Sequence, residues 1–314
     1  MKEYIIGKNE AGQRFDKYIF KLLKNAGTGL IFKQLRNKNI VLNGKKAKGN
    51  EILKENDSVR IFMSDDTINK FTGGPLHISK TGVRLDVIYE DDDILLASKP
   101  VGVLSQKSSD KDISMNEYLI EYLTDNGFGK ENLATFKPSF CNRLDRNTSG
   151  LMIAGKSLRG LQKMSEIIKD RSIHKFYLTI VKGIVDKKSV IKGYLRKDEK
   201  NNKVVIYDNP VKDSYEIHTE YEPLATKDDM TLLKVRLITG KTHQIRAHLA
   251  GISHPVLGDF KYGDKVFNEK YGEKKQLLHS YQVVFPKLDD FPDISEKSFN
   301  TPYPVNFTKY FKEN

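Results

Sequence analysis

Short apolar segments of strand length, interrupted by a few helical segments, fill most of this chain and constrain its fold more than any other feature. Residues 85–89 and 94–97 flank the acidic run 90–93, a pattern that predicts a hairpin. Further segments of strand character follow at 151–154, 176–181, 214–221 and 231–238. Consecutive strands are therefore not each separated by a helix.

Three helices are predicted among these strands. Ser114 and Glu117 form a capping-box pattern that opens a helix running to about Thr124. Ser157 precedes a periodic apolar segment that ends near Lys169, and a third helix is predicted at 242–250. Strict β-α-β-α alternation is missing, so the sequence predicts an α+β fold and not a Rossmann fold.

The first 63 residues predict a compact unit of their own. Apolar side chains recur at helical spacing in 15–23, and Thr28 is suited to cap a second helix. Asn43 and Gly44 lie between short apolar segments, which is a strong hairpin signal. At roughly 100–200 residues per domain, a chain of 314 residues is expected to hold two domains.

Charge is unevenly distributed between these parts. The chain carries a net charge of +12, and residues 1–63 contribute +8 of it. This excess indicates a polyanion as partner and a basic accessory module on a nearly balanced body. Residues 64–84 are polar, include Gly73-Gly74-Pro75 and show no apolar period, so we predict a linker there and a second domain at 85–314.

Several classes of protein are excluded by composition. No apolar run is long enough for a transmembrane helix, and the first residues lack the apolar core of a signal peptide. One cysteine, Cys141, can form neither an internal disulfide nor a cysteine-rich zinc site. We therefore expect a cytoplasmic protein without membrane contact.

Residues 142–150 contain the strongest candidate for a reactive group in the sequence. Asp145 is flanked by Arg143 and Arg146 and followed by small turn-forming residues. Nearby guanidinium groups favour an ionised carboxylate, which suits a nucleophile or a base and could also attract phosphates. The residues alone leave a loop salt bridge as the better interpretation, because the chain is rich in charged side chains.

A second cluster of polar side chains occupies residues 239–250. Lys241, Arg246, His243 and His248 crowd one or two helical turns there. The two histidines are five residues apart, which is not the spacing of a metal-binding pair, so no metal is expected. Neither a dinucleotide fingerprint nor a credible phosphate loop is present, and no nucleotide cofactor is expected.

From Leu85 to its C-terminus the chain closely resembles the RluA-type pseudouridine synthases. The stretches that carry this resemblance are LDVIYEDDDILLASKPVGVLS, NRLDRNTSGLMIAGKS, HKFYLTIVKG, LITGKTHQIRAHLAGISHPVLGDFKYG and LLHSYQVVFP. The first sixty residues, two short helices and a small basic sheet, resemble the S-four RNA-binding domain. The pair of domains is most similar to the bacterial branch that acts on large-subunit ribosomal RNA, the RluC/RluD-like branch.

The resemblance implies a role for each matching residue. Asp145 corresponds to the catalytic aspartate, Tyr177 to the base-stacking tyrosine and Arg246 to the arginine that pairs with the aspartate. The implied catalytic domain has a mixed, mainly antiparallel central sheet flanked by helices. Positions expected to bind RNA are Arg143, Arg146 and Lys175 around the aspartate, and Lys33, Arg36, Lys45, Lys46 and Lys48 in the S-four unit.

The implied reaction isomerises specific uridines, in 23S ribosomal RNA, without cofactor or metal. The uridine is extruded, the bond from C1′ to N1 breaks with the help of Asp145, and the base rejoins through C5. Asp145 attacks the sugar or removes a sugar proton, and both routes remain open. The alternatives are a synthase acting on tRNA, and a non-catalytic RNA-binding or ribosome-assembly factor. We expect a monomer.

Overall fold

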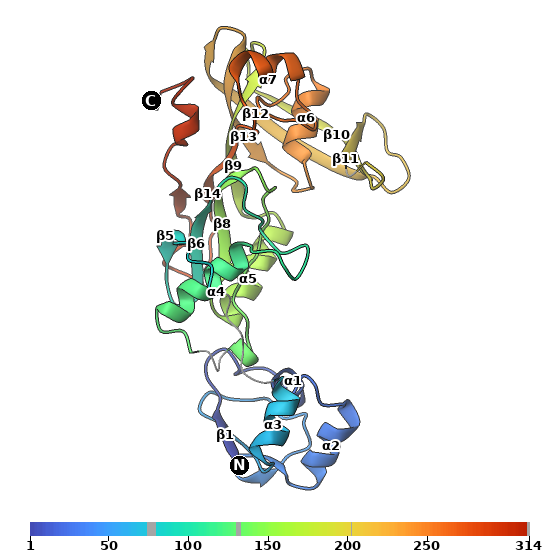
Figure 1. The fold of residues 1–314 in the computed structure, drawn as a ribbon, viewed down its shortest axis with the longest axis vertical. Coiled ribbons are helices and arrows are strands. Elements are labelled where there is room, and N and C mark those ends of the chain that lie inside the picture. The colour runs from blue at the N-terminus through green and yellow to red at the C-terminus, as the bar shows by residue number, and fades with distance from the viewer. Residues whose placement is uncertain (74–79, 130–132, 202, 313–314) are drawn as a thin grey trace.

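The structure, a computed structural model, describes residues 1–73, 80–129, 133–201 and 203–312. Figure 1 shows an N-terminal unit at one end of an elongated molecule and a larger unit that contains the rest of the chain. Strands and helices are mixed along the sequence, and the predicted α+β fold is confirmed. Across the described residues, no helix is both long enough and apolar enough to cross a membrane.

The N-terminal unit packs three helices against a small antiparallel sheet of order β1-β4-β2-β3. Asn43 and Gly44 connect β2 to β3 with φ values of 50° and 72°, the left-handed conformation that a tight hairpin needs. The elements are β1 (Lys2–Ile5), α1 (Phe15–Leu22), α2 (Thr28–Arg36), β2 (Ile40–Leu42), β3 (Lys45–Lys46), β4 (Ser58–Ile61) and α3 (Asp65–Thr72).

Two predictions for this region were wrong. Thr28 does not cap α2, because the helix already begins at Thr28 and Gly27 is its N-cap. The predicted linker at 64–84 contains α3, which Ser64 caps and which buries Ile68 in the N-terminal core. The part of that segment at 74–79 lies outside the described residues. Beyond it, the Thr81 backbone N–H donates to Glu121 at 2.8 Å, so the chain there is attached to the larger unit.

The larger unit is built on one long sheet of order β11-β10-β12-β13-β9-β14-β8-β6-β5, with β15 and β7 paired at its side. The β14–β8 pair is parallel and the other pairs are antiparallel, as predicted for a mixed, mainly antiparallel sheet. The strands are β5 (Asp86–Glu90), β6 (Ile94–Lys99), β7 (Ser139–Phe140), β8 (Ser149–Gly155), β9 (His174–Lys182), β10 (Ser189–Asp198), β11 (Lys203–Tyr207), β12 (Tyr215–Lys227), β13 (Met230–Leu237), β14 (Leu278–Val284) and β15 (Ser298–Asn300).

Helices cover both faces of this sheet. Leu95 and Ala97 of β6 join the core that contains α4, whereas Ile94 and Leu96 join the core on the side of α5. The alternation follows from the two-residue period of a strand, and it explains why β6 is apolar along most of its length. The helical elements are α4 (Met115–Asp125), α5 (Leu158–Lys169), α6 (Gln244–Gly251), α7 (Lys265–Tyr271) and a short 3-10 helix (Val305–Phe307).

Candidate active site

The loop between β7 and β8 holds Asp145 in a fixed position. The Leu144 backbone N–H donates to the hydroxyl of Ser105 at 2.9 Å, and that hydroxyl donates to the Leu144 carbonyl at 2.8 Å. One residue after Asp145, the carbonyl of Arg146 accepts a 3.0 Å hydrogen bond from the fully buried ammonium of Lys99. The main chain on each side of Asp145 is therefore bonded to residues distant in the sequence.

Sheet register places Tyr177 beside this loop. Ser280 of β14 pairs with Gly150 of β8 on one side and with Tyr177 of β9 on the other. Gly150 has a φ of 106°, and a Cβ at this position would lie 2.1 Å from the Ser280 carbonyl oxygen, so only glycine fits. The close approach of β8 to β14 therefore brings the Asp145 loop next to Tyr177.

Arg246 bridges two carboxylates. Its Nη1 donates to Asp145 Oδ2 at 2.7 Å, while its Nε and Nη2 donate to the two oxygens of Asp259 at 2.7 and 2.9 Å. The side chain of Asp259 is completely buried and that of Arg246 nearly so, whereas Asp145 is partly open to the pocket. The structure thus brings the predicted residues Asp145 and Arg246 into direct contact.

The charges of this array depend on one another. Burial disfavours the charged guanidinium, but the hydrogen bonds and charges of Asp259, followed by those of Asp145, raise the pKa of Arg246 above its ordinary value. Burial also acts to raise the pKa of Asp259. Arg246 and the backbone N–H groups of Lys261 and Tyr262 outweigh it and hold that pKa below its ordinary value. Two carboxylates therefore share one guanidinium.

The side chain of His243 also lies close to Asp145. It precedes α6 in the left-handed conformation, with φ 56° and ψ 11°, which costs a residue other than glycine about 1–3 kcal/mol. Its Nδ1 lies 2.9 Å from the Tyr262 hydroxyl, and its Nε2 lies 3.9 Å from Asp145 Oδ2. The strained turn therefore aims the imidazole at the carboxylate.

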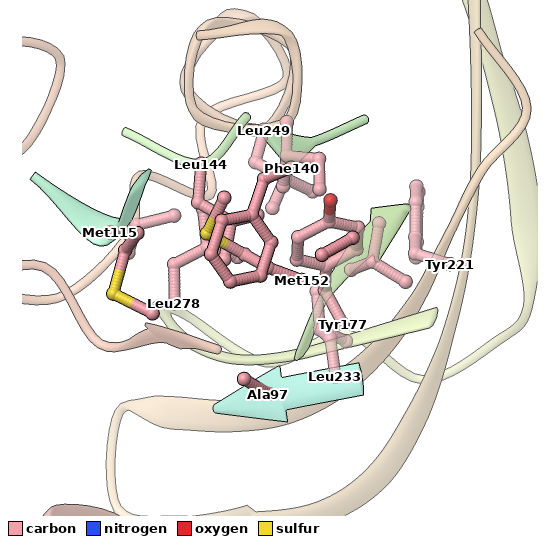
Figure 2. Close-up of a cluster of buried hydrophobic side chains, with 14 of the residues drawn as sticks. Ala97, Met115, Phe140, Leu144, Met152, Tyr177, Tyr221, Leu233, Leu249 and Leu278 are labelled. Atoms are coloured by element: carbon pink, nitrogen blue, oxygen red, sulfur yellow. The ribbon is translucent and has the colours of Figure 1, made fainter. Parts of the chain in front are cut away.

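Tyr177 forms part of the wall of the pocket that contains these groups. The pocket is lined by Asp145, Tyr177, His243 and Arg246 together with neighbouring residues. Figure 2 shows the ring of Tyr177 within the hydrophobic core, close to Leu233. Burial raises the pKa of Tyr177 to about 12, and the charge of Asp145 adds to this rise. A phenol in this state is a poor base at neutral pH but offers a firm apolar surface.

The predicted basic residues form two groups, one around this pocket and one in the N-terminal unit. Arg143 and Lys175 line the pocket, Arg143 exposed and Lys175 half-buried, and burial followed by the charge of Arg171 lowers the pKa of Lys175. Arg146 is exposed, and its Nε donates to the Gly102 carbonyl at 3.0 Å. The cations predicted in the N-terminal unit are all exposed: Lys33, Arg36, Lys45, Lys46 and Lys48.

Other candidate groups in the sequence have structural roles. His248 is buried and its Nδ1 bonds to the Thr219 hydroxyl at 2.9 Å, away from His243. Asp93 in the acidic turn forms an ion pair with Arg159 at 2.5 Å. Burial raises the pKa of Cys141 to about 11, which makes it a poor nucleophile. Within the described ranges, no cluster of three or more acidic, histidine or cysteine residues is arranged to hold a metal ion.

Sequence reasoning missed Asp259 and the function of Lys99. Asp259 lies inside one of the stretches that carry the family resemblance, but a lone aspartate before an aromatic turn gives no sign of a distant arginine partner. Lys99 donates to the carbonyls of Pro100, Val103 and Arg146, so it supports the loop of Asp145 from inside the protein. A lysine at the end of a mostly apolar strand was the available signal.

The sequence pattern described as RNA pseudouridylate synthase matches residues 93–251, which include Asp145, Tyr177, His243 and Arg246. An RNA pseudouridine synthase of Mycoplasma genitalium is 31% identical over 304 residues, spanning 94% of this chain and 93% of that protein. The ribosomal large subunit pseudouridine synthase C of Pasteurella multocida is 29% identical and spans 91% of this chain and 86% of that protein.

A solved structure has a similar fold. The human RNA pseudouridylate synthase domain containing 1 superposes with a TM-score of 0.57 at 21% identity, over 72% of this chain and 86% of that one. At this identity the superposition bears on the fold alone. The relatives match most of the chain, and the sequence pattern matches its central half.

Proposed function

The chain belongs to the RNA pseudouridylate synthase family and is an RNA pseudouridine synthase, and from this premise we propose that its substrate is large-subunit ribosomal RNA. The observation that carries the proposal is the name of relatives that match nearly the whole chain, ribosomal large subunit pseudouridine synthase C, at 27–30% identity. The basic N-terminal unit supports it, because a polyanion is the natural partner of such a surface.

The reaction would run in the pocket in front of Asp145. The target uridine leaves its stack, enters the pocket and lies against the ring of Tyr177. Asp145 attacks C1′ or takes a proton from the sugar, and the bond from C1′ to N1 breaks with its electron pair on the uracil. The base turns and C5 bonds to C1′, while Asp145 leaves that carbon or returns the proton to the sugar. C5 then loses its proton and N1 gains one, so atoms and electrons balance without a cofactor.

Arg246 would aim Asp145 at the sugar. It holds Oδ2 at 2.7 Å, which leaves the other carboxylate oxygen for the substrate. Asp259 prevents the guanidinium from rotating, since two of its donors are fixed on the buried carboxylate. Positioning of this kind is a large part of what an enzyme contributes to a unimolecular rearrangement.

The N-terminal unit, which includes α3, would act as an S-four-like RNA-binding domain. Two short helices precede a small basic hairpin, and the five predicted cations of this region are exposed on its surface. Contacts of this kind go mainly to phosphates and position the enzyme on folded RNA. Arg143, Arg146 and Lys175 would hold the phosphates nearest the pocket.

The experiment is expression in cells that lack their own large-subunit synthases, followed by mapping of pseudouridine in ribosomal RNA and tRNA. We expect new sites in large-subunit RNA with the native chain and none with Asp145→Asn, which keeps the size of the side chain and removes its charge. New sites in tRNA alone would contradict the proposed substrate. Retained sites in the Asp145→Asn variant would contradict the mechanism.

A further inference from the structure

His243 is held in the pocket by one short contact and one strained turn. Its Nδ1 lies 2.9 Å from the Tyr262 hydroxyl, and the two rings meet edge to face with centroids 5.5 Å apart. The residue keeps a left-handed backbone that glycine would adopt more easily. The imidazole is therefore fixed in orientation as well as in place.

The hydrogen bonds around Tyr262 favour one tautomer of His243. The Val204 backbone N–H donates to the Tyr262 hydroxyl oxygen at 2.8 Å. With its oxygen accepting there, the hydroxyl can donate its own proton to Nδ1 of His243. In a neutral imidazole the proton then resides on Nε2.

Burial keeps this imidazole neutral. It lowers the pKa of His243 against the opposing charge of Asp145, and the positive charges of Arg246 and Lys261 lower that pKa further. A neutral ring with its proton on Nε2 is a hydrogen-bond donor and not an acid at neutral pH. Such a donor can polarise a carbonyl without giving up its proton.

The donor points into the space where the substrate must lie. Nε2 is 3.9 Å from Asp145 Oδ2, which is beyond hydrogen-bond length, and that oxygen already accepts from Arg246. Both His243 and Asp145 line the pocket. A ligand atom close to the carboxylate therefore lies within reach of Nε2 as well.

We propose that His243 is a catalytic residue whose Nε2–H donates a hydrogen bond to O2 of the target uracil and stabilises the negative charge released onto the base. The inference rests on the proposed function, because it requires cleavage of the bond from C1′ to N1. That cleavage leaves its electron pair delocalised over N1, O2 and, through C6 and C5, O4. O2 is a carbonyl oxygen next to N1 and so lies close to C1′, and C1′ must lie beside Asp145. His243 keeps its proton throughout.

The test combines a change in the enzyme with a change in the substrate, in the manner of a double-mutant cycle. The RNA fragment that carries the mapped site is synthesised with uridine, 2-thiouridine or 4-thiouridine at the target, because sulfur is a weak hydrogen-bond acceptor. Single-turnover rates are measured for the native chain and for His243→Ala. We expect His243→Ala to slow uridine about a hundredfold, the usual effect of removing one such donor.

The proposal requires the two changes to overlap. The 2-thio substitution should slow the native enzyme and have little further effect on His243→Ala, whereas the 4-thio substitution should slow both by the same factor. Equal factors for 2-thiouridine in both proteins would overturn the proposal, and so would an unchanged rate of His243→Ala on uridine.

A second variant guards against loss of folding. Tyr262→Phe keeps the ring but removes the hydroxyl that fixes the tautomer, and we expect a smaller loss of rate that is likewise reduced with 2-thiouridine. RNA affinity should stay unchanged in both variants. If the native chain formed no pseudouridine in the fragment, the proposed substrate would be wrong. If the native chain is active but the rate losses from His243→Ala and from 2-thiouridine simply multiply, the proposed role of His243 is wrong and the proposed substrate stands.

Discussion

Replacing Asp259 with asparagine should disable the enzyme without changing the shape of its pocket. Asparagine has the size of aspartate, and its oxygen can still accept from the backbone N–H groups of Lys261 and Tyr262, now at 2.8 and 3.1 Å. The NH2 group of asparagine, however, would face the Nε–H of Arg246, and two donors cannot bond to each other. The guanidinium thereby loses one of its two carboxylate partners. Arg246 then depends on Asp145 alone.

The magnitude follows from burial. Removing one partner of a buried ion pair costs about 3–5 kcal/mol of stability, and we expect the lower end because Asp145 still compensates the charge of Arg246. A loosened guanidinium also shifts the carboxylate that it aims. A displacement of about 1 Å at a reacting group costs about a hundredfold in rate, or about 2.7 kcal/mol.

Two assays separate these effects. The urea midpoint reports the stability change, and single-turnover formation of pseudouridine under conditions where the variant is folded reports the rate. We expect the loss in the chemical step, with RNA affinity unchanged. Asp229→Asn is the matched control. Asp229 is about half-exposed, pairs with Lys270 and accepts from the Tyr271 hydroxyl, so this change should cost about 2 kcal/mol or less.

The acid side of the stability curve gives a third readout. The pKa of Asp259 is lower in the folded chain, so its contribution to stability is present above its unfolded pKa of about 4 and is lost as the pH falls through the folded value. Asp259→Asn should flatten that acid-side loss. A rate within twofold of the native rate, or a stability loss no larger than that of Asp229→Asn, would refute the role of Asp259 in holding Arg246.

Three further predictions test other parts of the structure. Tyr177→Phe should reduce the single-turnover rate less than tenfold, whereas Tyr177→Ala, which removes the ring, should reduce it more than a hundredfold; equal losses would mean that the hydroxyl takes part. Burial lowers the pKa of Lys99 to about 8, below its unfolded value, so the stability of the native chain should rise between about pH 8 and 10. Lys99→Met should remove that rise in urea titrations. Glutamine in place of the five exposed cations, Lys33, Arg36, Lys45, Lys46 and Lys48, should weaken RNA binding and reduce the salt slope of log K by about 0.7 for each phosphate that is no longer neutralised; an unchanged slope would contradict the proposed RNA surface.

Local signals predicted α4 and α5 of the larger unit well, whereas α7 was not predicted. Ser114 and Glu117 form the capping box of α4, and Ser157 caps α5 by accepting from the Gly160 backbone N–H. Such caps act within one turn of the helix, so the sequence around them contains the whole interaction. The Asn43-Gly44 hairpin was predictable for the same reason.

The error in the predicted linker has a physical cause. Most side chains of α3 are polar, and Ile68 is the residue that it buries deeply. A single buried side chain does not create an apolar period, so periodicity does not reveal this helix. The ends of the helix did carry signals, because Ser64 caps its first turn and Gly73 follows its last residue in the left-handed conformation.

The contacts within the site were beyond sequence reasoning alone. Asp145 and Arg246 are 101 residues apart, and their contact depends on how the loop before β8 and the start of α6 meet across the pocket. The roles of the two residues came from family resemblance. Spacing did not supply them, and Asp259, to which no role was assigned from the resemblance, escaped notice.

The distribution of charge in the pocket suits the bond that must break. Asp145, Arg246 and Asp259 together carry two negative charges and one positive charge, so Arg246 does not fully neutralise the carboxylate of Asp145. Heterolysis of a glycosidic bond places positive charge on the sugar carbon and negative charge on the departing base. A fully neutralised aspartate would attract that carbon less strongly, whereas the neutral His243 can donate to the base without adding a positive charge beside Asp145. Asp259 therefore has two roles: it fixes Arg246 in place, and it takes up part of the charge of Arg246, so that Asp145 keeps a negative charge facing the sugar.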